Sequence, residues 1–301
     1  MSLAVPLAVA ESIGCEALQT ISFGRLRVAA VFRRSFYLCR ERHWACFGTP
    51  EIGCGPLNIP LRTKGDIDWR SLLKPGQATK IVHGSLLIEG LAPIVLSDAE
   101  IWKPPPLPSW SKNDLLIGLS ELDRHLVVFP PPVSGLGCFA LNGGGASDPN
   151  RQTAVVRIAA RPIRALSDWL IAECPARNVP EVEQLLGLGP GLTPSGDDFL
   201  AGALGALQAV GAREHMQLLW SKLEPCLSSA TNEISAAHLQ CAASGQLSAA
   251  QHDILGAILS GNSVGLRRAL EMFSREAHTS PWDGLAGMAT VLRATVRKRY
   301  N

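Results

Sequence analysis

The order of apolar and polar positions changes character along the chain. Up to about residue 160, short apolar runs alternate with polar residues, as they do in strands that bury one face. From about Arg164 onward, apolar residues recur every three or four positions, as on one face of an amphipathic helix. The pattern predicts an α+β chain. A β-rich, antiparallel N-terminal domain over residues 1–163 is followed by an all-α helical bundle over residues 164–301.

Four stretches of the N-terminal half are predicted to be strands. Residues 24–48 alternate and are rich in Val, Phe and Tyr, and residues 78–98 have the form of two strands about a turn at His83 and Gly84. Residues 124–131 and 152–162 add two short strands. No long helical pattern separates these stretches, which favours antiparallel pairing over βαβ units. The apolar start of the chain lacks a basic region, so we expect a short helix or a packing arm rather than a secretory signal.

The C-terminal half is predicted to be a succession of helices joined by short linkers, so that neighbouring helices pack antiparallel into a bundle. Small residues are frequent in them and would let helix axes approach closely. The predicted helices cover residues 165–174, 180–187, 195–210, 213–227, 231–245, 248–261, 263–277 and 281–299.

The composition of the chain indicates which classes of binding partner and which cellular compartment to expect. The net charge of +2 over 301 residues gives no reason to expect nucleic acid or a membrane surface as a partner, and no apolar run is long enough to predict a membrane span. Charged residues make up only 18% against 47% hydrophobic residues, which favours subunit interfaces, so a homo-oligomer is expected. Eight cysteines without a C-x-x-C pair indicate a reducing cytoplasm and argue against a zinc cluster.

The segment "GLGPGLTPSGDDFLAG" at 187–202 is the densest candidate for chemistry. Gly191 and Gly196 have the spacing of a Walker A loop, but Asp197 stands where the phosphate-binding lysine belongs, which excludes a nucleotide P-loop. A dinucleotide fingerprint needs a preceding strand, and the residues before this segment are predicted to be helical. Ordinary helix capping is the alternative: Ser195 would accept from the amide three residues on, and Asp198 would face the helix dipole.

The motif occurs twice in the chain, which favours a role beyond the capping of a single helix. "SGDDFLAG" at 195–202 matches "SPWDGLAG" at 280–287, which pairs Ser195 with Ser280 and Asp198 with Asp283. The repeat predicts two helices that pack through Gly202 and Gly287 with their N-termini on the same side.

Several helix N-termini with free amides and hydroxyls make a small-anion site. A third helix start in "SSATNEISAAH" adds hydroxyl and amide groups to the two repeated ones. The alternative, that all three starts are ordinary caps, stays open. The predicted anion-binding residues are Gly189, Gly191, Thr193, Ser195, Gly196, Asp198, Thr231, Asn232, Ser235, Thr279, Ser280 and Asp283.

Two residues are candidates for catalysis. His278, directly before Thr279 and Ser280, is the predicted general acid or base. If Asp198 caps its helix, Asp197 is left free to take part in chemistry or to hold Mg²⁺. Apart from this Mg²⁺ option, no cofactor is expected.

The three helix starts also carry a family resemblance. "LGLGPGLTPSGDDFLAG", "TNEISAAHLQCAASGQL" and "HTSPWDGLAG" resemble the marked stretches of the AllH (YlbF-type) family, specifically over about residues 180–290. The resemblance implies a subunit of oxamate carbamoyltransferase in allantoin catabolism, a branch of purine degradation. That complex converts oxalurate and phosphate into oxamate and carbamoyl phosphate, and includes an FdrA-like subunit and a second large subunit. One departure is Pro281, where the family commonly has Gly; it removes one backbone amide from the last helix start.

Three functions therefore follow as hypotheses. The first is a cytoplasmic carbamoyltransferase subunit that binds a small anion, such as phosphate or an oxamate- or oxalurate-like acid, at helix N-termini. The second is a non-catalytic scaffold or ligand-binding subunit, favoured by the apolar composition and the absence of a recognisable nucleophile. The third is a stand-alone hydrolase of ureido compounds with a metal at Asp197.

Overall fold

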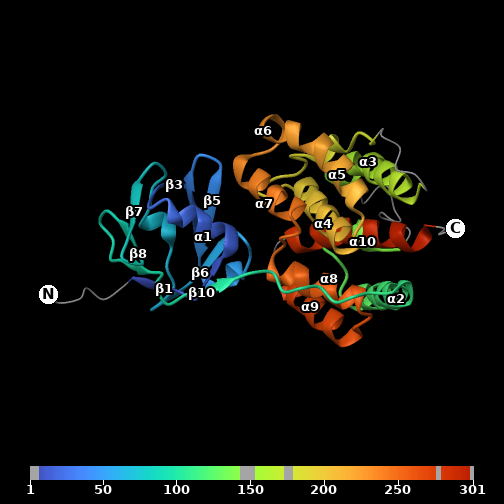
Figure 1. The fold of residues 1–301 in the computed structure, drawn as a ribbon, viewed down its shortest axis with the longest axis horizontal. Coiled ribbons are helices and arrows are strands. Elements are labelled where there is room, and N and C mark those ends of the chain that lie inside the picture. Colours follow the sequence, from blue (N-terminus) through green and yellow to red (C-terminus); the bar gives the residue numbers. More distant parts are fainter. Residues whose placement is uncertain (1–6, 143–152, 173–178, 276–278, 299–301) are drawn as a thin grey trace. The chain divides into compact units, whose positions relative to one another are not determined.

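Two compact units make up the chain, Met1–Pro104 and Pro105–Asn301, in the computed structural model (Figure 1). The structure describes residues 7–142, 153–172, 179–275 and 279–298. The order of a β-rich unit before a helical one confirms the predicted fold class. The units meet at Pro104 and Pro105, whereas the sequence placed the boundary near residue 163.

Eight strands of the first unit close into a barrel in the order β1-β6-β5-β4-β3-β7-β8-β9, and β10 pairs with β2 in a separate two-stranded sheet. Most neighbours are antiparallel, as predicted, but β1 with β9, β5 with β6, and β10 with β2 are parallel. The strands are β1 (Ala8–Ala10), β2 (Ser12–Gly14), β3 (Arg25–Val31), β4 (Ser35–Arg40), β5 (His43–Gly48), β6 (Asn58–Thr63), β7 (Ala78–Val82), β8 (Ser85–Ile88), β9 (Ile94–Val95) and β10 (Glu100–Trp102).

Aromatic side chains fill the barrel. Phe36 on β4 and Phe47 on β5 are fully buried and stack with ring centroids 5.2 Å apart. Trp69 from the turn η2 (Trp69–Ser71) packs on Phe36 at 4.8 Å. The predicted turn at His83 and Gly84 is confirmed: both have positive φ and join β7 to β8. Alternation with aromatic and β-branched residues therefore predicted the regions of β3 to β5 and of β7 to β9, but not β1, β2, β6 and β10.

The described part of the apolar N-terminal stretch forms two strands rather than the short helix that was one of the two expectations. β1 lies between β6 and β9 in the barrel, and β2 runs directly into α1 (Cys15–Ser22). The hydroxyl of Thr20 on α1 donates to the carbonyl of Trp44 on β5 over 3.0 Å. The apolar N-terminal stretch thus contributes β1 to the barrel wall. This agrees with the other expectation, that the stretch is a packing arm.

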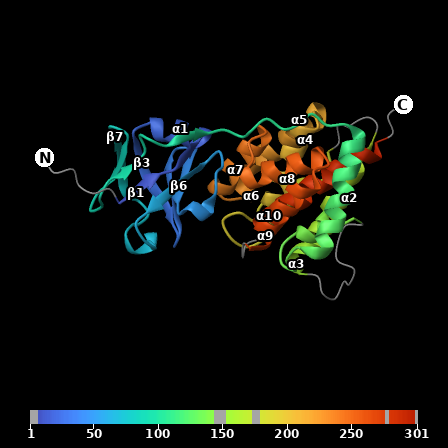
Figure 2. The ribbon, with the colours of Figure 1, turned by 90° about the horizontal axis from the view of Figure 1, so that it is seen from below.

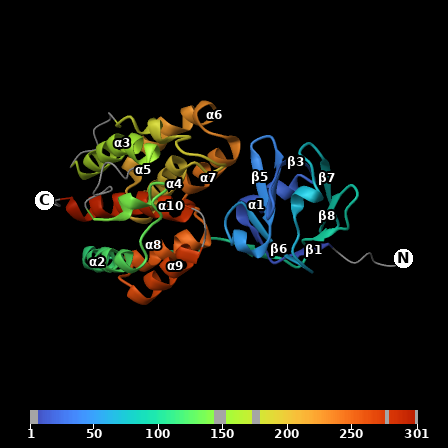
Figure 3. The same ribbon diagram turned by 180° about the vertical axis from the view of Figure 1, so that it is seen from behind.

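The second unit is a bundle in which α4 and α10 lie side by side at the centre, with α2, α8 and α9 packed together against α10 (Figures 2 and 3). Its helices are α2 (Lys112–Val128), α3 (Ala154–Ile171), α4 (Ser195–Ala209), α5 (Arg213–Leu223), α6 (Leu227–Ala230), α7 (Glu233–Ala243), α8 (Ala249–Leu259), α9 (Ser263–Arg275) and α10 (Ser280–Arg297). Short 3-10 turns are η1 (Pro50–Ile52), η3 (Gly137–Ala140), η5 (Val182–Leu185) and η6 (Glu224–Cys226).

Two of the predicted strands are helices. Residues 124–131 fall on the end of α2, which begins at a capping box between Ser111 and Asp114 and buries leucines at helical spacing. In the stretch predicted over 152–162, the described residues from 154 onward fall on α3, whose N-cap is Thr153. In short windows their β-branched residues resembled strands, but the helical period continues well beyond those windows. The helix predicted over 180–187 is only the 3-10 turn η5.

Candidate functional site

The loop over residues 186–194 and the start of α4 are organised by backbone contacts rather than by the side-chain cap that the sequence offered as the alternative. The N-cap of α4 is Pro194, without a side-chain cap bond, and Ser195 is the first helical residue. The amides of Asp197 and Asp198 both donate to the carbonyl oxygen of Pro194, over 2.9 and 3.1 Å. The alternative that Ser195 caps the helix is therefore wrong, because the carbonyl of Pro194 already accepts from these amides.

The starts of α10 and α7 differ from each other. The N-cap of α10 is Thr279, which makes no side-chain cap bond, and Pro281 lies in its first turn. At α7 the side chain of Asn232 accepts from the amide of Ser235 over 3.0 Å, so this start has an ordinary cap. The same Asn232 also donates to the carbonyl oxygen of Leu192 over 2.8 Å and ties the loop to α7.

Asp197 is an anchor and not the free carboxylate that the sequence suggested. Its side chain is 1% exposed and accepts from the amide of Gly187 over 2.9 Å, from the hydroxyl of Ser235 over 2.7 Å and from the hydroxyl of Thr231. Burial raises the pKa of Asp197, while these donors favour the ionised form. The carboxylate thus joins the loop, α4 and α7, and its donors occupy the oxygens that a metal would need.

Asp283 plays a similar part at the start of α10. Its side chain is fully buried, and its Oδ1 accepts from the amide of Leu136, next to the turn η3. Its Oδ2 is buried without a hydrogen-bond partner among the described residues. Burial raises the pKa of Asp283 to about 6. Asp283 therefore holds a distant segment against the start of α10, as Asp197 does at the start of α4. Nothing in the sequence indicated that residues 135–137 are the partner of Asp283.

Unlike Asp197 and Asp283, Asp198 does not anchor another segment of the described chain. Its Oδ2 is buried and makes no hydrogen bond within the described part of the chain. Burial raises its pKa well above the ordinary value, and the nearby carboxylates of Asp283 and Asp197 raise it further, while the hydroxyls of Ser280 and Thr193 act in the opposite direction. A carboxyl group in these surroundings favours its neutral form.

The hydroxyls of Thr193 and Ser280 lie 2.9 Å apart and connect the loop to α10. Around Thr193 the loop is built with Gly189 and Gly191 at φ of 116° and 99°, which a residue with a side chain rarely adopts. The backbone N–H groups of Gly189, Gly191, Thr193 and Ser195 donate to no acceptor among the residues that the structure describes. The turn thus exposes donors beside two hydroxyls, an arrangement suited to an anion.

Close contact between α4 and α10 brings the two repeated motifs together, as predicted. A Cβ atom on Gly202 would lie 1.9 Å from the carbonyl oxygen of Gly284, and one on Gly287 would lie 1.9 Å from that of Phe199. Only glycine permits this approach. The contacts pair equivalent ends of the two helices, which confirms that their N-termini lie on the same side.

The described parts of the predicted site come from loop 189–194 and the starts of α4, α7 and α10, and the contacts above join them into one cluster. His278 lies outside the described residues, so its role stays a prediction. In the described ranges, no group of three or more His, Cys, Asp or Glu side chains could hold a metal ion. No described helix has the length and apolar character needed to cross a membrane.

The fold and the site together define a class of protein. It has a β-barrel unit followed by a helical unit, and the helical unit contains a duplicated motif at two helix starts. Residues 185–292 match the family model described as oxamate carbamoyltransferase subunit AllH. This match supports the predicted resemblance to the AllH family over that part of the chain, and it covers the loop and the starts of α4, α7 and α10. No curated protein and no solved structure gives a significant match to the chain.

Proposed function

We propose that the chain is a subunit of a carbamoyltransferase complex similar to oxamate carbamoyltransferase, in allantoin catabolism, and that it binds a small anion where α4 and α10 begin. The family model supports the first part, because its description names an enzyme subunit and its match spans this region. FdrA-like and second large subunits are the proposed partners, and phosphate or an oxalurate-like ureido acid is the proposed ligand.

The observation that carries the anion site is the set of unused donors in the loop. The amides of Gly189, Gly191 and Thr193 have no acceptor among the described residues, and the hydroxyls of Thr193 and Ser280 lie beside them. Asp197 and Asn232 hold this loop against α7, so its donors are fixed before a ligand arrives. Preorganised donors are the main device for stabilising charge that develops on oxygen during acyl transfer.

Asp198 replaces Asp197 as the proposed acid of the site. An ionised carboxylate would repel an anion, but burial raises the pKa of Asp198, and a neutral carboxyl group donates a hydrogen bond. In the proposed reaction a phosphate oxygen forms a bond to the carbamoyl carbon of oxalurate while the bond from that carbon to the oxamate nitrogen breaks. Asp198 would deliver a proton to the leaving nitrogen and recover one from phosphate. His278 is the second proposed proton carrier.

Reconstitution with the FdrA-like and second large subunits tests this function, with carbamoyl phosphate formed from oxalurate and phosphate as the readout. Asp198→Asn and Ser280→Ala should each lower kcat at least about tenfold, since the first removes the acidic proton and the second removes a hydroxyl donor. Ser260→Ala is the matched control, because that exposed serine bonds only to carbonyls of its own helix α8.

The scaffold hypothesis predicts a different outcome. A scaffold would be needed for assembly, yet both variants would retain full activity and the chain would give no heat with phosphate in calorimetry. The metal hydrolase hypothesis predicts turnover by the chain alone that chelation abolishes.

A further inference from the structure

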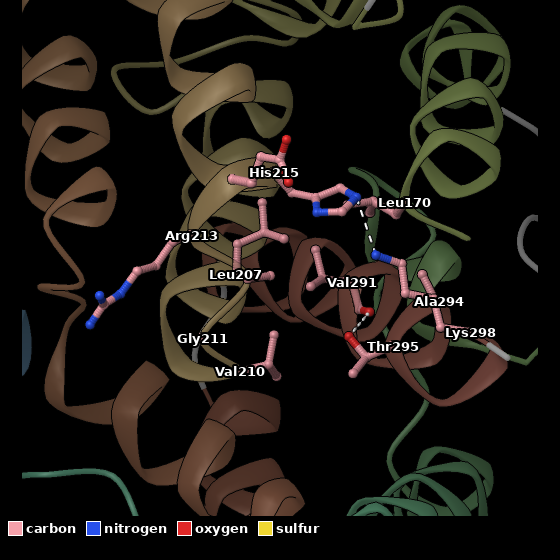
Figure 4. A pocket seen from close by; sticks show the side chains of 12 residues that line it. Leu170, Leu207, Val210, Gly211, Arg213, His215, Val291, Ala294, Thr295 and Lys298 are labelled. Atoms are coloured by element: carbon pink, nitrogen blue, oxygen red, sulfur yellow. Dashed lines mark hydrogen bonds between the residues drawn. The ribbon is translucent and has the colours of Figure 1, made fainter. Parts of the chain in front are cut away.

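A cavity lies at the opposite end of α4 from the loop, where α4 ends, α5 begins and the last turns of α10 pass (Figure 4). Its volume is about 370 Å³, and its apolar wall includes Leu170, Leu207 and Val291. A helix as long as α4 separates its two ends by roughly 20 Å at a rise of about 1.5 Å per residue. The cavity is therefore distinct from the anion site proposed above.

His215 and Lys298 point toward each other across this cavity, from α5 and α10 (Figure 4). The Nζ of Lys298 and the Nε2 of His215 lie 3.3 Å apart. An ammonium group can only donate, so Nε2 must accept, and the ring proton must sit on Nδ1. Burial and the charge of Lys298 both lower the pKa of His215, which keeps the ring in this neutral form.

The Nδ1–H of His215 is a donor without an acceptor among the described residues. The side chain is 5% exposed, and the ring of Trp169 holds it edge to face with centroids 4.9 Å apart. His215 lines the cavity, and its Nδ1 is not among the buried side-chain atoms that lack a partner, so a ligand in the cavity can reach this donor.

The first turn of α5 adds further donors on the same side. Its N-cap is Ala212, which has no side chain able to cap, and the amides of Glu214 and His215 have no acceptor in the part of the chain that the structure describes. The side chain of Arg213 points away from the cavity in Figure 4. Glu214 also lines the cavity, so its lining contains one acidic residue beside Lys298 and His215.

We propose that this cavity is a second binding site, for a small organic carboxylate with an apolar tail. The carboxylate would accept from Nδ1 of His215, from the α5 amides and from Lys298, and the tail would lie against Leu207 and Val291. This inference does not depend on the carbamoyl-transfer function, because none of its residues belongs to the loop or to the start of α4, α7 or α10.

Calorimetry on the full chain tests the site with hexanoate, hexanol and inorganic phosphate as probes. Hexanoate should bind at one site per chain, hexanol at least about tenfold more weakly, and phosphate should not compete. Lys298→Met should weaken hexanoate binding about tenfold, because it keeps the aliphatic stem and removes the charge-assisted donor. Lys222→Met is the matched control, since Lys222 pairs with Glu183 and does not line the cavity.

His215→Phe supplies a second variant, in which the ring stays against Trp169 and both nitrogens are lost. It should also weaken hexanoate binding, with circular dichroism confirming an unchanged fold. Absence of hexanoate binding would overturn the proposal. Equal affinity for hexanoate and hexanol, or equal affinity of the wild type and Lys298→Met, would overturn it too, because the cavity would then be only an apolar hollow.

Discussion

The hydroxyl of Ser235 donates to the carboxylate of Asp197 over 2.7 Å, although 38 residues separate the two along the chain. Both groups are almost completely buried, at 1% exposure each. This bond fixes the start of α7 against the start of α4. It also explains why a conspicuous acidic residue in a glycine-rich loop is structural: its oxygens accept donors from the loop and from α7.

Replacing Asp197 should therefore destabilise the chain rather than simply remove an activity. Asp197→Ala leaves the Gly187 amide and two buried hydroxyls without their acceptor, which should lower the free energy of unfolding by about 3 kcal/mol. Urea denaturation followed by circular dichroism measures this. Asp253→Ala, at an exposed position of α8, should change the free energy by less than about 0.5 kcal/mol. Equal effects of the two variants would contradict the anchoring role.

Asp283 should make stability depend on pH in a defined direction. Because its folded pKa is raised from 3.8 to about 6, its neutral form is favoured in the fold. Its contribution is fully present below about pH 4 and is lost as pH rises through about 6. Asp283→Asn keeps an acceptor for the Leu136 amide and cannot ionise. In the wild type, the free energy of unfolding should fall between about pH 4 and pH 6. In Asp283→Asn this fall should be smaller by about 2–3 kcal/mol.

Urea midpoints measured from pH 4 to pH 7 check this prediction, with Asp253→Asn as the control that should follow the wild-type curve. The raised pKa values of Asp197 and Asp198 act in the same direction, so some slope should persist in Asp283→Asn. A slope unchanged from the wild type would show that Asp283 ionises as freely in the folded chain as in the unfolded one.

The glycine contact between α4 and α10 should be intolerant of a single methyl group. In Gly202→Ala the new Cβ would lie 1.9 Å from the carbonyl oxygen of Gly284, so the helices must separate, at a cost of at least about 2 kcal/mol. Gly256→Ala is a matched control within α8, where the nearest atom would lie 3.6 Å away. That change should be neutral or stabilise by up to about 1 kcal/mol through helix propensity. Thermal unfolding of both variants distinguishes the outcomes.

The hydroxyl pair of Thr193 and Ser280 should govern affinity for a small anion without governing stability. Thr193→Val and Ser280→Ala each remove one part-buried hydroxyl, and phosphate affinity measured by calorimetry should fall about tenfold. The melting temperature should shift by no more than a few degrees. Unchanged phosphate affinity in both variants would contradict the proposed anion site. The helix starts would then have a structural role only.

The sequence alone determined the parts of this protein that depend on local pattern. Alternation with aromatic residues predicted most of the barrel strands, although not β1 and β6, and helical spacing predicted most of the bundle. The repeat at 195–202 and 280–287 predicted that α4 and α10 meet through glycine, because close helix contact needs small residues at fixed intervals. The same segments carry the match to the AllH family.

Only the tertiary structure decided what depends on partners far away in the chain. It made helices of residues 124–128 and 154–162, where short windows of Val and Ile resembled strands, because the burial of a long helical face outweighs local β preference. It also reversed the roles of two adjacent carboxylates. Asp197 received donors from Gly187, Thr231 and Ser235, while the Oδ2 of Asp198 was buried with none among the described residues. Sequence shows which carboxylates are available, but the donors that reach them are set by packing.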